Sequence, residues 1–401
     1  MSTRSAMFGE ASTMRRARLA ANSAVISAVM AVAFAPCCAL ASSFSGPRAG
    51  SIPVEFLLFA AVLAGVVLLP ARNLPIALAG ALVLAAYKVA ASPFAAGAGL
   101  RGLIGHLQGE WVTLCDLGLL LLGFALLATH FERSRVPDVL PAILPADWKG
   151  GFALLAAVFV LSSFLDNIAA ALIGGALARV VFRGAIHVGY LAAIVAAANA
   201  GGSGSVVGDT TTTMLWISGV GAGEVLSAYV AAATALVLCG VIAARQQQRL
   251  SPILPGPATR VGVDWVRAGI VALILAAAIA VNVVINTRLQ PVSGRFPFLG
   301  AAVWGALALA VPLRAPDWRV LPAATAGTAF LLLLVLSASM LPVDSLPPPG
   351  WQAAFGLGVV SAVLNNIPLT ELAIRQGGFD WAYVAYAVGF GGSMIWFGSS
   401  A

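Results

Sequence analysis

Charged residues are scarce in this sequence. Only 9% of its 401 residues are Asp, Glu, Lys or Arg, whereas a soluble domain of this size carries about 25%. The hydrophobic fraction is 60% and the mean hydropathy is +0.97. Too few polar residues remain to cover a water-facing surface, which excludes a soluble globular protein. The net charge of +7 therefore does not indicate nucleic-acid binding, and its meaning lies in its distribution across a membrane.

Cysteine and histidine are also rare, with four and three residues respectively. The cysteines lie in apolar segments and show neither the spacing of a metal site nor a disulfide framework. The histidines lie near the ends of predicted membrane spans, which favours interfacial positions over functional ones. A membrane barrel would need alternating segments of about ten residues, and the sequence has none.

Long apolar runs are what the sequence does have. Several approach or exceed the roughly 20 residues that a helix needs to cross a bilayer. Ordinary spans are predicted at 54–70, 74–91, 111–130, 225–243, 268–287, 298–313 and 320–341. Four other runs, 150–182, 187–219, 351–376 and 382–401, are interrupted by polar residues or glycine. We therefore expect an all-α polytopic protein of the cell (inner) membrane, with the lipid bilayer and no nucleic acid as partner.

Residues 1–41 allow two interpretations. Three arginines precede an apolar run from Ala24 to Pro36, and Ala39-Leu40-Ala41 then forms an A-x-A cleavage pattern. This is the layout of a signal peptide, and it equally fits an uncleaved first membrane helix. Both interpretations place residue 50 outside the cell.

The interrupted regions match each other in sequence. Ser162, Leu165, Asn167 and Ile168 recur 199 residues later as Ser361, Leu364, Asn366 and Ile367. Gly201, Gly202, Ser203 and Gly208 recur 190 residues later as Gly391, Gly392, Ser393 and Gly398. Two motifs in the same order, at nearly the same offset, predict an internal repeat.

Charge distribution predicts that the two repeats are inverted. If 150–182 and 351–376 are re-entrant hairpins and every other segment crosses, 16 of the 22 Lys and Arg residues are cytoplasmic and 6 are outside, as the positive-inside rule requires. The expected divisions are 42–149 and 220–350 as scaffold helices, 150–219 as the hairpin and broken helix of repeat one, and 351–401 as those of repeat two.

Polar residues at the breaks predict a substrate site. Irregular backbone inside a bilayer is tolerated only where it is buried in protein or lines a cavity, and half-helix ends there bind ions. Asp166 and Asp209 both lie at breaks, where each is either an ion ligand or a helix cap. Asp116, inside a predicted span, faces the bundle interior or pairs with a neighbour, and Glu371 either approaches the site or reaches the outer surface.

An intramembrane enzyme is disfavoured. Gly201-Gly-Ser-Gly204 fits the G-x-S-G of rhomboid-type serine proteases, but no histidine follows His187 to act as the base. A di-aspartyl protease would pair Asp166 with Asp209, yet its G-x-G-D signature is absent because the chain reads Val206-Val-Gly-Asp209. We expect neither an enzyme nor a bound cofactor.

The broken-helix motifs resemble those of the ion transporter superfamily, and most of all those of NhaD-type sodium/proton antiporters and citrate-transporter-like proteins. Ser162-Ser-Phe-Leu-Asp-Asn167 and Gly208-Asp-Thr-Thr-Thr-Thr-Met-Leu-Trp216 carry the likeness in the first half. Asn366-Ile-Pro-Leu-Thr370 and Gly391-Gly-Ser393 carry it in the second. The resemblance implies an elevator-type carrier, usually a homodimer, in which a transport domain of hairpins and broken helices moves against a scaffold.

The chain departs from the family pattern at two places. The second hairpin has Asn365-Asn366 where the antiporters have Asp-Asn, so one titratable group is missing. The chain also stops at Ala401, where family members continue through another half-helix and at least one more span. A truncated, non-transporting membrane protein is therefore a third hypothesis, beside cation/proton antiport and the transport of organic anions or arsenite.

Cation/proton antiport is the function that the residues favour, because no Lys or Arg lies near either break to bind an anion. Asp166 and Asp209 would alternate between a proton and Na⁺. The expected site residues are Ser162, Asp166, Asn167, Gly201, Gly202, Ser203, Asp209, Thr210, Asn365, Asn366 and Ser393.

Overall fold

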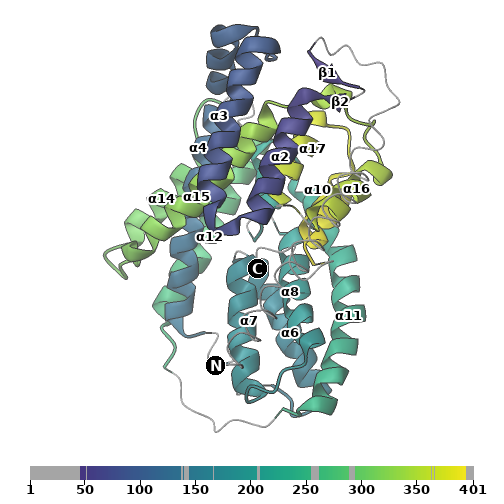
Figure 1. The fold of residues 1–401 in the computed structure, drawn as a ribbon. Helices are drawn as coiled ribbons and strands as arrows, with labels where there is room; N and C mark the ends of the chain where they lie inside the picture. The colour runs from purple at the N-terminus through teal and green to yellow at the C-terminus, as the bar shows by residue number, and fades with distance from the viewer. Residues whose placement is uncertain are drawn as a thin grey trace, which may run out of the picture.

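The fold is almost entirely helical (Figure 1). The computed structural model describes residues 46–50, 52–136, 139, 144–165, 167–205, 208–253, 262–288, 294–362, 364 and 366–393. The first 41 residues, Asp166, Asn365 and Ala401 lie outside these ranges, so the predictions made for them stay predictions. A two-stranded antiparallel ribbon of β1 (Arg48–Ala49) and β2 (Ile52–Pro53) precedes the first described helix.

Several of the described helices are uninterrupted. They are α2 (Val54–Leu68), α3 (Asn73–Ala91), α4 (Gly99–Ser134), α11 (Ala228–Leu250), α12 (Trp265–Arg288), α14 (Phe298–Ala310) and α15 (Leu321–Ser339). Short helices η2 (Pro70–Arg72), η4 (Trp318–Val320), η5 (Val343–Ser345) and α10 (Ala222–Leu226) join them. Within the described residues, five helices are long and apolar enough to cross a membrane, and they contain α3, α4, α11, α12 and α15. The prediction of a polytopic, all-α membrane protein is confirmed at this level.

Helices end at the polar residues and glycines that interrupt these apolar runs in the sequence. In the first pair, α6 (Trp148–Ser162) is separated from α7 (Asn167–Val181), and α8 (Val188–Ser203) from α9 (Thr210–Ile217). In the second region, α16 (Trp351–Ser361) is separated from α17 (Asn366–Gln376), and α18 (Trp381–Gly391) follows. Pro368 fits in the first turn of α17, because the amides of that turn have no partner within the helix.

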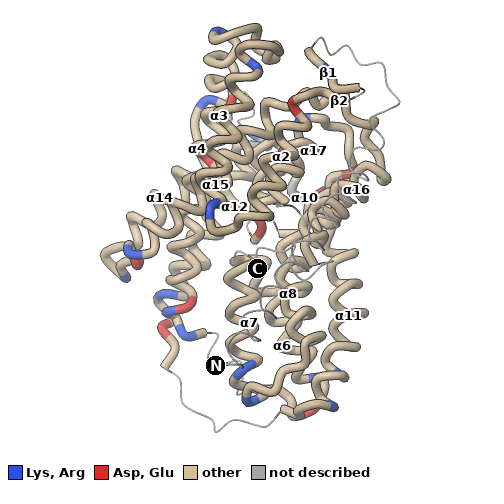
Figure 2. The backbone as a smooth tube through the Cα atoms, viewed as in Figure 1, with Lys and Arg blue, Asp and Glu red and all other residues tan. Residues whose placement is uncertain are grey.

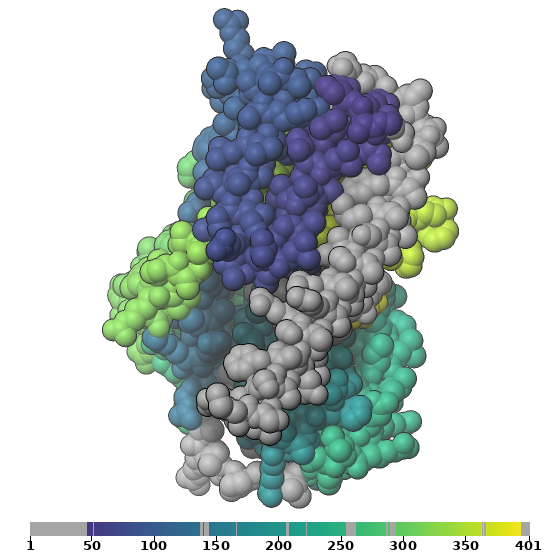
Figure 3. All heavy atoms as spheres, in the orientation of Figure 1, coloured from purple at the N-terminus to yellow at the C-terminus, as the bar shows by residue number. Residues whose placement is uncertain are grey.

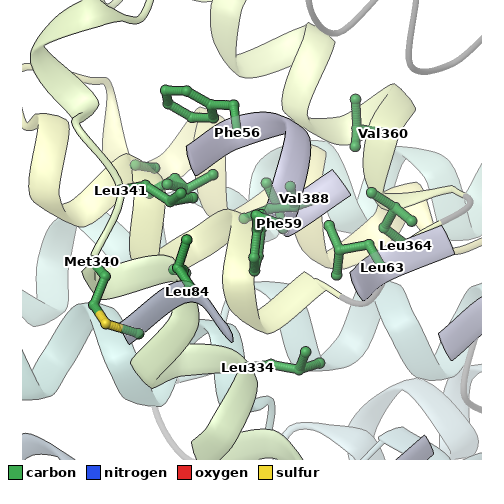
Figure 4. Close-up of a cluster of buried hydrophobic side chains, with 14 of the residues drawn as sticks. Phe56, Phe59, Leu63, Leu84, Leu334, Met340, Leu341, Val360, Leu364 and Val388 are labelled. Atoms are coloured by element: carbon green, nitrogen blue, oxygen red, sulfur yellow. The ribbon is translucent and has the colours of Figure 1, made fainter. Parts of the chain in front are cut away.

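The helices bury their apolar faces in separate clusters. Helices α6, α7, α8 and α11 share one cluster and form the lower half of the view in Figures 1 and 3. Helices α4, α12 and α14 share another. The second interrupted region instead packs against α2, α3 and α15. Figure 4 shows this contact, with Phe59 and Leu63 of α2 close to Leu364 and Val388.

Charged residues gather towards the helix ends, and long uncharged stretches separate them (Figure 2). One such group joins the ends of α4, α12 and α14. The Asp264 carboxylate accepts a hydrogen bond from Arg314 Nε at 2.9 Å and lies 3.4 Å from Arg267 Nε. The hydrogen bond from Arg314 is the largest cause of a lowered Asp264 pKa. Arg133 pairs with Asp317 nearby, so ion pairs tie these helix ends together outside the apolar band.

Helix α4 is much longer than the predicted span of 111–130. It begins at Gly99 and ends at Ser134, and two polar residues of its first half, His106 and Glu110, contact other helices. His106 is buried and hydrogen-bonds Ser339 at 2.9 Å. His130 is likewise buried, against Arg267. Both histidines pack against neighbouring helices, and their expected position near the membrane interface stays a prediction. His187 accepts a hydrogen bond from Gly189 at the start of α8.

The orientation of the first hairpin can be tested by labelling. Lys149 is exposed in the first turn of α6, and Ala185 is exposed after α7. In a cysteine-free background, Lys149→Cys and Ala185→Cys are expected to react with an impermeant maleimide only from the cytoplasmic side. Gln352→Cys, at the start of the second hairpin, is expected to react only from outside. Labelling of residues 149 and 185 from opposite sides would contradict the re-entrant hairpin.

Candidate functional site

Asp209 lies at the break before α9, in the position that a helix cap would occupy. Its backbone is extended, and its side chain makes no capping hydrogen bond to the described first turn of α9. The residue is 3% exposed. Oδ1 accepts a hydrogen bond from Asn366 Nδ2 at 3.3 Å, whereas Oδ2 has no hydrogen-bond partner among the described residues. Thr210 and Thr211 of that turn still face the carboxylate, so capping contributes to its environment but leaves Oδ2 without a well-formed hydrogen bond to the described residues.

The second repeat supplies two of the surfaces around Asp209. Asn366 is the first residue of α17, so the donor to Oδ1 comes from the second hairpin. Gly389 of α18 lies against Oδ2 of Asp209. A Cβ on Gly389 would stand 3.3 Å from that oxygen and 3.1 Å from Ser203 Cβ. Segments more than 150 residues apart in the sequence thus enclose one carboxylate.

Three polar side chains form a second link between the repeats. Asn167 Nδ2, at the start of α7, donates to Asn199 Oδ1 at 3.0 Å. Asn199 Nδ2 in turn donates to Ser393 Oγ at 2.8 Å. Asn167 and Ser393 were each predicted as site residues, and Asn199 connects them. Asn199 was missed as a site residue, although it opens the polar, glycine-rich break and that position could have indicated it.

The other expected site residues divide into lining and supporting groups. Thr210 lines a cavity next to Asp209. Ser203 is buried and donates to the carbonyl of Ala200 at 2.8 Å, which closes the last turn of α8. The Ser162 hydroxyl is buried without a hydrogen-bond partner among the described residues. Gly202 lets the chain approach Asp209, because a Cβ there would lie 3.1 Å from the Asp209 Cβ.

Gly201 has a packing role. A Cβ at this position would lie 2.0 Å from the carbonyl oxygen of Phe159 on α6. No side chain fits at that distance, so glycine is required for α6 and α8 to pack this closely. Nearby, Ser163 donates to the Gly201 carbonyl at 3.1 Å and Ser205 donates to the Ser163 carbonyl at 2.5 Å. These bonds hold the two breaks of the first repeat against each other.

A cavity of about 470 Å³ lies against the site. Asn167, Asp209 and Asn366 line it together with residues of α4 and α15. Along α4 its lining extends from Leu117 to the exposed Glu132, which is roughly 22 Å of helix at 1.5 Å per residue. The cavity therefore connects the breaks with the end of α4 that charge distribution places in the cytoplasm.

The charge of this cavity has one sign. Among the described residues that line it, Asp209 and Glu132 are the charged ones, and both are acidic. Most of the remaining lining is apolar, including Leu120, Phe124 and Leu331. A small cation entering along this path would meet a carboxylate at each end, and none of the described lining residues is basic.

Comparison with known proteins supports a transporter. No protein-family model matches the chain. The chain is 28% identical over 317 residues to sodium/proton antiporter 1 of Arabidopsis thaliana, covering 70% of this chain and 52% of that protein. It is similar to plant sodium/proton antiporters. A 94-residue segment is also 40% identical to sodium/proton antiporter 2 of the same plant, covering 23% of this chain and 20% of that protein. Both relatives are named as sodium/proton antiporters.

The alignments cover only part of each relative. The chain spans about half the length of the first of these relatives and about a fifth of the second. The similarity therefore extends over only part of each known protein.

Two carboxylates that the sequence left open lie away from the cavity. Asp116 is buried, and its Oδ1 accepts a hydrogen bond from the Gly300 amide at 2.6 Å. It thus caps the start of α14 from the neighbouring helix α4. Glu371 is also buried, and it pairs with Arg375 at 2.6 Å. Neither side chain lines the cavity beside Asp209.

The link through Asn199 can be tested by removing it. Asn199→Ala would remove the side chain that accepts a hydrogen bond from the Asn167 amide and donates one to the Ser393 hydroxyl. Loss of a buried hydrogen-bond partner costs about 1–3 kcal/mol, so we expect the maximal rate of ion exchange to fall roughly tenfold. The measurement is initial exchange rate per inserted molecule. Asn282→Ala, at a buried asparagine of α12 away from the cavity, is the control. Equal rates in both variants would contradict the role of Asn199.

Proposed function

We propose that this chain is a secondary transporter that exchanges Na⁺ for protons across a membrane, through a site at the helix breaks. One observation carries the proposal. A buried carboxylate, Asp209, has one oxygen without a hydrogen-bond partner among the described residues, and it lines a cavity whose described charged residues are all acidic.

The chemistry follows from the cost of a buried charge. A carboxylate in a low-dielectric environment is disfavoured as an anion unless something neutralises it. A proton on Asp209 or a cation bound to it satisfies this need equally, and the two cannot occupy the same oxygen together. Alternation between them on the two sides of the membrane would couple Na⁺ movement to proton movement in the opposite direction.

Neutral oxygens near Asp209 would complete the cation site. Thr210 and Asn366 line the same cavity, and Asn199 connects Asn167 to Ser393 beside it. Such oxygens can replace part of the hydration shell of Na⁺ without adding fixed charge. Asp166, next to Asn167 in the sequence, would add a second carboxylate. In the second hairpin, Asn365 cannot titrate, so the site would be asymmetric and dominated by repeat one.

An anion substrate fits the site less well. Carboxylate and oxyanion sites usually recruit Arg or Lys, and none of the described residues that line the cavity is basic. The starts of α7, α9 and α17 carry positive partial charge. Asp209 already lies at the start of α9 and offsets part of that charge.

Inverted repeats and an elevator motion are the architecture that we propose around this site. The close approach of Gly201 to the Phe159 carbonyl has a counterpart, because a Cβ on Gly391 would lie 2.3 Å from the Gly358 carbonyl oxygen. Gly391 follows Gly201 by 190 residues, and Gly358 follows Phe159 by 199. These are the two offsets of the sequence repeat, so the matching contacts support it.

The cavity lies between the helix breaks and the helices against which they would move. On one side are α4 and α15, and on the other are the breaks before α7, α9 and α17. A body containing the breaks would carry the site along the surface of α4 and α15, from the side open at Glu132 to the opposite side. The carrier would act as a homodimer in the cell (inner) membrane, as the NhaD resemblance implies.

Ion flux in everted membrane vesicles tests the proposed function. Addition of Na⁺ or Li⁺ to vesicles acidified by respiration is expected to dequench an acridine-type pH probe, because protons leave as cations enter. Uptake of labelled citrate by the same vesicles is expected to stay at the level of vesicles without the protein. Citrate uptake together with an unchanged probe signal would overturn the proposal and favour an anion carrier.

A further inference from the structure

Three charged side chains join α17 to α4 outside the cavity. Arg375 Nε donates to Glu371 Oε1 at 2.6 Å, one turn earlier on α17. Its Nη2 donates to Glu110 Oε1 on α4. The Glu371 side chain is 5% exposed and the other two are partly buried. One guanidinium therefore connects two helices that lie 265 residues apart in the sequence.

Helix α17 connects this ion group to the cation site. Its first residue, Asn366, donates to Asp209 Oδ1, and Arg375 follows nine residues later. At 1.5 Å per residue, the two positions are about 13 Å apart along the helix axis. A helix of this length behaves as a rigid element, so a restraint at one end sets the position of the other.

Most other contacts of the helix are apolar. Ile367 and Ile374 pack against α15, and Leu369 and Leu372 join the cluster shared with α2. At its end, Gln376 Nε2 donates to the Pro347 carbonyl of the adjoining loop. Apolar packing permits sliding, whereas a guanidinium held by two carboxylates has a fixed geometry. His106 of α4 lies near Glu110, Arg375 and Lys88 of α3, but Arg375 is the group that bonds to both α4 and α17.

We infer that Arg375 is a positioning residue of the cation site, which holds α17 against Glu110 of α4 so that Asn366 stays on Asp209. The inference rests on the proposed function. Arg375 does not touch the ion itself. Its loss would shift α17 and weaken the Asn366 hydrogen bond, and the cation affinity would fall while the coupling carboxylate stays in place.

The transport test compares two single variants with the unchanged protein in the vesicle assay. Arg375→Gln is expected to raise the half-saturating Na⁺ concentration roughly threefold to tenfold, the range for weakening one hydrogen bond to a charged group, with the maximal rate per inserted molecule largely kept. Arg101→Gln, at an exposed arginine near the start of α4, is the control and is expected to leave both values unchanged.

A charge swap separates positioning from a general structural role. Glu110→Arg combined with Arg375→Glu keeps the net charge and again places one guanidinium between two carboxylates. It is expected to restore the half-saturating Na⁺ concentration to within about twofold of the original. An unchanged Na⁺ dependence in Arg375→Gln, or no recovery in the swap, would overturn the inference. Should Arg375→Gln fail to insert, Arg375→Lys takes its place, since Lys keeps the charge but loses the two-pronged geometry.

A labelling arm does not depend on Na⁺ transport. Ile367, the second residue of α17, lines the cavity and is 2% exposed. In a cysteine-free background, Ile367→Cys is expected to react slowly with a maleimide. Adding Arg375→Gln is expected to raise that rate several-fold, and the charge swap to lower it again. If the unchanged protein shows no Na⁺/proton exchange, the proposed function fails, and this arm alone decides the inference. Equal rates with and without Arg375 would overturn it.

Discussion

Asp209→Asn is expected to reduce Na⁺-dependent proton flux to the level of vesicles without the protein. Asparagine keeps the size of the side chain and can still bond to Asn366, but it cannot exchange a proton for a cation. Insertion and folding should be retained, because no described hydrogen bond to Oδ2 is lost. The measurement is probe dequenching by Na⁺ at equal amounts of inserted protein.

The matched control is Asp344→Asn, at an exposed aspartate of η5. It makes the same chemical change away from the cavity and is expected to leave the flux unchanged. Flux that persists in Asp209→Asn at equal expression would contradict the account. Asp209 would then be a helix cap without a coupling role, and an anion carrier would become the better hypothesis.

Gly201→Ala is expected to prevent the first repeat from packing. Its Cβ would lie 2.0 Å from the Phe159 carbonyl oxygen, which is backbone and cannot rotate away. Overpacking typically costs about 1–3 kcal/mol, and a clash with rigid backbone should lie at or above the upper end. We expect little monodisperse protein after extraction, with a clearly lowered melting temperature in what remains.

Gly175→Ala is the control for that change. Gly175 lies inside α7, and a Cβ there would meet nothing within 4 Å. Alanine in a helix interior is favoured over glycine by about 1 kcal/mol, so this variant should be as stable as the original or slightly more so. Equal melting temperatures for Gly201→Ala and Gly175→Ala would show that α6 and α8 do not approach as closely as described.

Local sequence patterns predicted much of the fold. Apolar runs located the five helices that are long enough to cross a membrane, but the predicted spans 54–70 and 298–313 form helices of only 15 and 13 residues. Polar interruptions located the breaks at Ser162–Asn167, Ser203–Thr210 and Ser361–Asn366. These features depend on residues a few positions apart, so they can be inferred without a structure. The start of α4 at Gly99 was missed because His106 and Glu110 read as polar, whereas Ser339 and Arg375 shelter them.

The candidate site was predicted as a set of residues but not as an arrangement. Asn199 bonds to Ser393, 194 residues away, and α4 and α15 line the cavity with side chains that carry no motif. Gly389 follows Asn199 by 190 residues, the repeat offset. Its missing side chain leaves room for the Asp209 carboxylate. This difference between Asn199 and Gly389 arises from contacts between distant segments, which sequence spacing does not show.

Proton release on cation binding tests the central claim most directly. Purified protein in weakly buffered detergent solution would receive Na⁺ while a pH indicator is followed. If proton and cation compete for Asp209, Na⁺ releases about one proton per molecule in the original protein, and Asp209→Asn gives a much smaller signal. The contradicting result is saturable Na⁺ binding with equal proton release from the original protein and from Asp209→Asn. Proton and cation would then not exchange at this carboxylate.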